Sequence, residues 1–213
     1  MPRAEPIVHV VDDEAAIRDS LAMLLRSVGL ASRTWSSAQE FLSGYAPGGP
    51  ACLIVDVRMP GMSGLELQEA LRARADPLPV VIVTGHGDVS MAVRAMKNGA
   101  ADFLEKPFND QTLLDTVHRA LAAAGTAGGA AGGAAAASAD RIAVAARLNA
   151  LTPREREVME LVAEGRPNKV VATRLGLSTR TVEVHRAKVM EKMGARSLAD
   201  LVRMAIAAEV LRP

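Results

Sequence analysis

The chain has 213 residues, of which 25 are Lys or Arg, 24 are Asp or Glu and only 2% are aromatic. This length favours two small domains over one large one, and a hydrophobic content of 49% argues against a disordered chain. The single cysteine, Cys52, excludes an internal disulfide framework and a cysteine-rich zinc site, so a reducing compartment is expected. Charge interrupts the stretch MPRAEPIVHVVDDE too early for a signal peptide, and we expect a cytoplasmic protein.

Charge is distributed unevenly between the two halves of the chain. Residues 1–119 carry a formal charge of −4, whereas residues 140–213 carry +5. An acidic half can hold a metal ion, and a small basic half suits a polyanion such as DNA. The basic half has no aromatic side chain on which an unpaired base could stack, so duplex DNA is favoured over single strands.

A tract rich in alanine and glycine separates the halves. Ala120–Ala139 has no charged residue, but it is almost entirely alanine and glycine, so we expect no membrane-spanning helix. Glycines interrupt the alanines at five positions, which is typical of a linker. We predict a first domain over 1–121, a linker over 122–140 and a second domain over 141–213.

The first half alternates short apolar runs with amphipathic stretches. Runs at 7–11, 53–57 and 80–84, and another near Phe103, are typical of buried parallel strands, and the weakest strand pattern lies near Ser32–Trp35. Apolar residues recur at helical spacing between the runs. The pattern predicts an α/β domain with a five-stranded parallel sheet.

Polar residues follow the predicted strands. Asp12 and Asp13 follow the first, Asp56 the third, Thr84 the fourth and Lys106 the fifth. Carboxylates gathered at one edge of a sheet repel one another unless they share a cation, and an all-oxygen site suits Mg²⁺. One carboxylate can then attack a phosphoryl group while a hydroxyl and an ammonium bind its oxygens. The alternative is that each residue has only a structural role, such as a helix cap, a turn or a surface charge.

Four motifs together resemble the receiver domain of two-component response regulators, over residues 7–121. They are VDDE at 11–14, DVRMPGMSG at 56–64, VTGHGD at 83–88 and EKPF at 105–108. The stretch 84–108 is similar in particular to the FixJ-type subfamily. The resemblance implies a doubly wound, flavodoxin-like fold and a soluble partner for a sensor histidine kinase.

The same resemblance assigns roles to residues of the site. It implies that Asp56 is the phosphoacceptor and that Mg²⁺ is held by Asp12, Asp13, Asp56 and the backbone carbonyl of Arg58. It further implies that Thr84 and Lys106 move onto the phosphoryl group, that Phe103 changes rotamer with them, and that the Lys106-Pro107 peptide bond is cis.

The basic half predicts four short helices. Thr152 caps a helix that begins at Pro153 and ends at Gly165, and a second helix runs from Pro167 to Leu175. After Gly176, a third helix begins at Ser178 or Thr179 and continues to about Met193, and SLAD at 197–200 caps a fourth. Two helices joined by a glycine-containing turn indicate a helix-turn-helix in a small all-α domain.

The third of these helices has two different faces. Val182, Val189 and Met193 lie within about 40° of one another and predict an inward face. The outward side carries Arg180, Glu183, Val184, Ala187 and Lys188. Such side chains suit base edges: an apolar group packs on a thymine methyl, a carboxylate accepts from a cytosine amine, and a cation reaches guanine or phosphate. An ordinary solvated surface is the alternative.

Residues 148–211 resemble the LuxR or NarL type of DNA-binding domain, through LTPREREV, GRPNKVVATRLGLSTRTVEVHRAKVMEKMGA and SLADLVRMA. The resemblance implies that Lys169, Thr179 and Thr181 approach phosphates. It also implies that the stretch 179–193 enters the major groove and that the helix over 197–210 makes a dimer contact.

The two halves together predict a transcription regulator that is activated by phosphorylation and is not an enzyme. A histidine kinase donates phosphate to Asp56, and the chain then forms a homodimer on duplex DNA, with RNA polymerase as a further partner and no membrane contact. One alternative is an aspartate-nucleophile phosphatase, which needs an acid two residues later, where Arg58 stands. Another is a constitutive DNA-binding protein whose first domain only dimerises.

Overall fold

The computed structural model describes residues 5–85, 89–126 and 143–208. The chain divides into two compact units, Met1–His86 with Asn98–Ala130, and Gly87–Lys97 with Ala131–Pro213. In the part of the chain that is described, no helix has both the length and the apolar character needed to cross a membrane.

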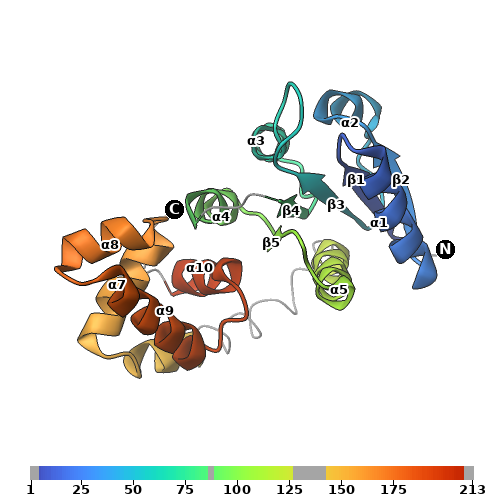
Figure 1. The fold of residues 1–213 in the computed structure, drawn as a ribbon. Helices are drawn as coiled ribbons and strands as arrows, with labels where there is room; N and C mark the ends of the chain where they lie inside the picture. The colour runs from blue at the N-terminus through green and yellow to red at the C-terminus, as the bar shows by residue number, and fades with distance from the viewer. Residues whose placement is uncertain (1–4, 86–88, 127–142, 209–213) are drawn as a thin grey trace. The chain divides into compact units, whose positions relative to one another are not determined.

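A parallel five-stranded sheet forms the centre of the first unit (Figure 1). Its strands are β1 (Ile7–Val11), β2 (Ala31–Trp35), β3 (Ala51–Asp56), β4 (Val80–Thr84) and β5 (Asp102–Glu105). They lie in the order β2-β1-β3-β4-β5, which is the flavodoxin-like order and confirms the predicted α/β fold. The order reverses between β1 and β3, so the carboxyl ends of these strands are neighbours at the switch point of the sheet.

Helices cover the sheet because every residue of β3 and β4 is buried and needs apolar cover on both faces. One face packs against α1 (Ala15–Ser27) and α5 (Asp110–Thr126) in a single apolar cluster. The other helices of this unit are α2 (Ala38–Gly44), which contacts β2, and α3 (Gly64–Ala73), which contacts β4. The helix α5 continues beyond the predicted linker start at 122, and residues 127–140 lie outside the described residues.

The second unit is helical and contains α4 (Val89–Lys97) together with the C-terminal helices. These are a helix at 143–149, α7 (Pro153–Ala163), α8 (Asn168–Leu175), α9 (Thr179–Met193) and α10 (Leu198–Ala207). The four predicted helices are confirmed; Thr152, Ser178 and Ser197 cap α7, α9 and α10 with their side chains, and Pro167 precedes α8 without a side-chain cap. The helix at 143–149 was not predicted, and residues 209–210 of the last predicted helix lie outside the described residues.

A buried histidine lies among aromatic rings in the first unit. The Nε1 of Trp35 donates a hydrogen bond to Nδ1 of His9 at 3.2 Å, so this nitrogen must be unprotonated. The rings of Phe41 and Tyr45 meet the imidazole edge-on, with centroids 5.5 and 5.2 Å away. Burial lowers the pKa of His9, and the nearby charge of Arg33 adds to the effect.

We predict that mild acid destabilises the first unit through His9. The pKa of His9 in the native protein lies below its usual value of 6.5. Below pH 6.5 the unfolded chain therefore binds a proton that the native chain does not bind. The free energy of unfolding falls as the pH drops below 6.5 for this reason. Urea unfolding followed through Trp35, the single tryptophan, measures this loss between about pH 7.5 and about pH 5.5. The variant His9→Gln keeps an acceptor for Trp35 and should show a smaller loss.

The exposed His118 of α5 provides the matched control. His118→Gln should keep the wild-type pH dependence of stability. An equal loss in wild type and His9→Gln would contradict this role of His9.

One ion pair fastens the beginning of α7 to the end of α9. The carboxylate of Glu155 accepts from the N–H of Thr152 at 2.8 Å and from Nζ of Lys192 at 2.6 Å, and Glu155 is buried. The hydrogen bond from Lys192, followed by that from the Thr152 backbone, lowers the pKa of Glu155 from 4.5 to about 2.

This pair should stabilise the second unit at neutral pH and lose its effect in acid. A depressed native pKa contributes stability that is complete above 4.5 and disappears as the pH falls toward about 2. Glu155→Gln keeps a side-chain acceptor for the helix cap but removes the charge, so calorimetry should show a lower melting temperature near neutral pH and a smaller difference from wild type in acid. The control Glu157→Gln removes an exposed charge from the same helix and should change little. A difference that stays constant with pH would be the contrary result.

Candidate functional site

The carboxyl edge of the sheet gathers the polar residues predicted from the strand ends. Asp12 follows β1, Asp56 is the last residue of β3, and Thr84 is the last residue of β4. The pairing of Val11 with Val55 continues toward Asp12 and Asp56, which brings these two carboxylates to adjacent positions at the switch point. Lys106 follows β5, and its N–H donates to the carbonyl oxygen of Thr84 at 2.7 Å.

A single ammonium joins the two carboxylates. Nζ of Lys106 lies 2.9 Å from Oδ2 of Asp12 and 2.8 Å from Oδ1 of Asp56. Both acids are withdrawn from solvent, with exposures of 1% for Asp12 and 7% for Asp56. Burial acts to lower the pKa of Lys106, but the hydrogen bonds and charges of Asp56 and Asp12 outweigh it and raise the pKa above its usual value. Asp12, Asp56 and Lys106 therefore form an ion-paired acidic site at the edge of the sheet.

Backbone groups hold the remaining carboxylate oxygens. Oδ2 of Asp56 accepts from the N–H of Arg58 at 2.5 Å, and Oδ1 of Asp12 accepts from the N–H of Glu14 at 2.9 Å. The side chain of Asp13 is exposed. Among the described residues, no three acidic, histidine or cysteine side chains gather closely enough to be assigned as a metal cluster. The structure thus brings Asp12 and Asp56 together around Lys106 and leaves Asp13 at the rim.

Gly64 has a steric role that the sequence motif did not reveal. A Cβ at this first residue of α3 would lie 2.3 Å from the carbonyl oxygen of Asp56, a distance that real Cβ atoms do not reach. The capping box of Ser63 and Glu66 begins α3 at this point. Only glycine therefore lets α3 start directly against the Asp56 backbone.

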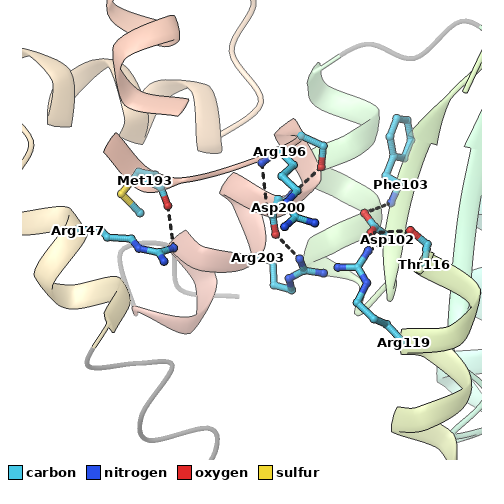
Figure 2. Close-up of polar contacts among 10 residues, drawn as sticks. Asp102, Phe103, Thr116, Arg119, Arg147, Met193, Arg196, Asp200 and Arg203 are labelled. Carbon is cyan, nitrogen blue, oxygen red and sulfur yellow. Dashed lines mark hydrogen bonds and ion pairs between the residues drawn. The ribbon is translucent and has the colours of Figure 1, made fainter. Parts of the chain in front are cut away.

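Phe103 stands beside a polar network that sequence reasoning missed. The phenyl ring is buried, and the N–H of Phe103 donates to the neighbouring carboxylate of Asp102 at 2.9 Å. As Figure 2 shows, this carboxylate also accepts from Nη2 of Arg119 at 2.8 Å and from Oγ1 of Thr116 at 3.4 Å, both on α5. The network ties the start of β5 to α5.

The Lys106-Pro107 peptide bond is cis, as the resemblance implied. Residues 86–88 of the third motif lie outside the described residues.

The second unit presents the predicted helix-turn-helix. Gly176 ends α8 with φ +64°. Leu177 and the capping residue Ser178 follow, and α9 begins at Thr179. In α9, Val182, Val189 and Met193 are buried, as predicted. The outward side chains are all exposed: Arg180, Glu183, Val184, Ala187 and Lys188.

Other predicted contact residues lie near the two helix starts. Thr179 is exposed, Thr181 is half-buried and shares a 2.7 Å hydrogen bond with Ser178, and Lys169 is exposed in the first turn of α8. Arg186 is half-buried, and its Nη1 donates to Oδ1 of Asn168 at 2.7 Å, which joins α9 to α8. The apolar side chain of Val184 is 50% exposed.

Comparison with known proteins agrees with this geometry. Residues 8–118 match the response regulator receiver domain, and residues 149–205 match the family described as bacterial regulatory proteins, luxR family. The chain is 49% identical over 210 residues to the transcriptional regulatory protein FixJ of Azorhizobium caulinodans, covering 99% of this chain and 96% of that protein. It is 50% identical to the C4-dicarboxylate transport transcriptional regulatory protein DctR of Rhodobacter capsulatus, covering 92% of this chain and 98% of that protein.

One solved structure of a similar chain covers both units of this protein. The full-length FixJ structure from B. japonicum is 45% identical, covers 99% of this chain and all of that chain, and has a TM-score of 0.52. The chain therefore belongs to the two-component response regulators of the FixJ type, which are phosphorylation-dependent transcriptional regulators with a receiver domain and a luxR-type DNA-binding domain.

Proposed function

We propose that Asp56 is the residue that accepts the phosphoryl group from a sensor histidine kinase. The observation that carries this proposal is the contact of Lys106 with both Asp56 and Asp12. An ionised carboxylate at the edge of the sheet is a competent nucleophile, and the adjacent ammonium can bind the negative charge that a phosphoryl group brings. Receiver domains and luxR-type domains occur together in regulators that have a kinase partner and bind DNA.

The donor set of the acidic site suits the Mg²⁺ that receiver domains generally bind where they are phosphorylated. Two buried carboxylates already share one cation in this structure, and all the available donors are oxygens. The ligands in this proposal are Asp12, Asp13, Asp56 and the backbone carbonyl of Arg58. Bound there, Mg²⁺ would offset the negative charge of the acids and of the incoming phosphoryl group.

In this proposal, the residues around Asp56 respond to the charge that phosphorylation adds. Phosphorylation adds nearly two negative charges and three acceptor oxygens at one point. In this proposal the hydroxyl of Thr84 and the ammonium of Lys106 donate to those oxygens, and Phe103 changes rotamer as the space beside Thr84 changes. Thr84 and Phe103 are both buried, so these movements repack the end of the sheet rather than its surface.

Removing the Asp56 carboxylate nucleophile should abolish phosphorylation. Asp56→Asn keeps the size of the side chain but removes the attacking oxygen anion, so labelling from acetyl phosphate or from a cognate kinase should fall to background. Intact-mass spectrometry detects the added phosphoryl group. Asp115→Asn, at an exposed position on α5, is the control and should be labelled like wild type. Undiminished labelling of Asp56→Asn would refute the assignment.

For the second unit we propose that α9 enters the major groove of duplex DNA. The exposed apolar Val184 and Ala187 can pack on thymine methyl groups, and Glu183 can accept from a cytosine amine. Arg180 and Lys188 can reach guanine or phosphate from the same side. The phosphate contacts in this proposal are made by Lys169, Thr179 and Thr181 at the starts of α8 and α9.

Two substitutions should separate phosphate binding from base reading. Lys169→Ala should weaken binding to all sequences alike and reduce the slope of log affinity against log salt by about 0.9.

Val184→Ala should instead alter preference at one base pair. The test uses a duplex that the wild-type protein has selected from random sequences. Replacing the contacted thymine by uracil removes one methyl group and should lower the affinity of the wild-type protein about fourfold. The same replacement should lower the affinity of Val184→Ala much less. Fluorescence anisotropy measures both effects, and an exchange of the two patterns would show that α9 is misplaced.

We propose a receiver domain over 1–121, a linker over 122–140 and a DNA-binding domain over 141–213. Phosphorylation favours a homodimer, with the dimer contact over 197–210, and the dimer on DNA works with RNA polymerase in the cytoplasm. The protein has no catalytic turnover in this proposal, and a small phosphoester hydrolysed by the chain would favour the phosphatase alternative.

A further inference from the structure

The helix at 143–149 is built into the core of the second unit. Val144 and Leu148 are buried and belong to the same apolar cluster as Met193 of α9. Arg156 of α7 donates from Nη2 to the carbonyl oxygen of Leu148 at 3.0 Å, which fastens this helix to α7. Residues 143–148 precede the luxR-family match, which begins at 149. The folded part of this unit is therefore larger than the family motif alone indicates.

Arg147 connects this helix to the end of α9. Its Nη1 donates to the carbonyl oxygen of Met193, the last residue of α9, at 3.0 Å (Figure 2). The final carbonyls of a helix have no donor within the helix, and a cation there also complements the negative end of the helix dipole. Gly194 follows with φ +64°, and a Cβ at this position would already lie 3.4 Å from Nη1 of Arg147. The guanidinium thus caps α9 from a neighbouring helix.

The position of α9 matters more for one kind of DNA contact than for the other. Non-specific attraction to phosphates comes mainly from charge, and the cationic phosphate contact of the proposed function, Lys169, lies on α8, so a small shift of α9 leaves most of this attraction intact. Contacts of short side chains with base edges depend on where the helix lies in the groove. Val184 and Ala187 are short and exposed, so a small displacement of α9 would take them out of reach of a base.

We propose that Arg147 is a positioning residue that holds α9 in the place required for sequence-specific binding of duplex DNA. The inference rests on the proposed role of α9 as the reading helix. In this role Arg147 touches neither base nor phosphate, and it acts through the Met193 carbonyl. Its loss should therefore reduce specific binding while non-specific binding remains.

The full-length chain tests this with two duplexes, one selected from random sequences by the wild-type protein and one with the same bases scrambled. Arg147→Met should lower the ratio of specific to non-specific affinity by about fivefold or more, as expected when a base contact is lost. The salt dependence of non-specific binding should not change. Arg147→Lys should restore most of the ratio, because its ammonium can donate to the same carbonyl.

Arg196→Met is the matched control, since it removes the same charge three residues beyond Met193. Arg196 is exposed, and its backbone N–H donates to Asp200 at 3.1 Å, a contact that survives the substitution. The control should keep the wild-type ratio. An unchanged ratio in Arg147→Met would overturn the proposal. So would a uniform loss with a salt slope shallower by about 0.9, which would make Arg147 a phosphate contact. A wild-type ratio near one would contradict the reading role of α9 itself and the inference with it.

Discussion

Two carboxylates that share one ammonium determine the character of the first unit. Asp12 and Asp56 are brought together by the reversal of strand order between β1 and β3, and two buried carboxylates side by side need a neighbouring cation to offset their charge. Lys106 supplies that cation from the end of β5. The site therefore holds two negative charges and one positive charge, and in the proposed function a phosphoryl group on Asp56 adds further negative charge at the carboxyl ends of β1 and β3.

The second unit depends on contacts at the two ends of one helix. Ser178 caps the beginning of α9, while Glu155 and Arg147 hold its end through Lys192 and the Met193 carbonyl. Buried valines fix the rotation of α9, and the outward side then carries both signs of charge with a half-exposed valine. Such a surface suits the edges of base pairs better than uniform attraction to phosphate. The charges of −4 and +5 on the two halves of the chain agree with this separation of tasks.

The strand-end residues could be predicted because a parallel sheet places successive carboxyl ends at one edge. Two caps of the C-terminal helices could also be predicted, because Thr152 and Ser197 each stand three residues before an acidic residue. Three contacts could not be predicted, because each joins residues far apart in sequence and leaves no periodic signal. They are the contacts of Lys106 with its two carboxylates, of Glu155 with Lys192, and of Asp102 with Arg119. The helix at 143–149 was missed because it follows the alanine and glycine tract and has only two large apolar residues, Val144 and Leu148. The spacing of Val144, Leu148 and Leu151 was the signal that could have indicated it.

We propose that phosphorylation of the acidic site changes the affinity of the DNA-binding helix for its duplex. The most direct test measures the affinity of the full-length chain for its selected duplex, at one fixed salt concentration, with and without acetyl phosphate and Mg²⁺. We expect wild type to bind more tightly when phosphorylated and Asp56→Asn to show no change. Equal affinity of phosphorylated and unphosphorylated wild-type protein would contradict the claim and favour a constitutive DNA-binding protein.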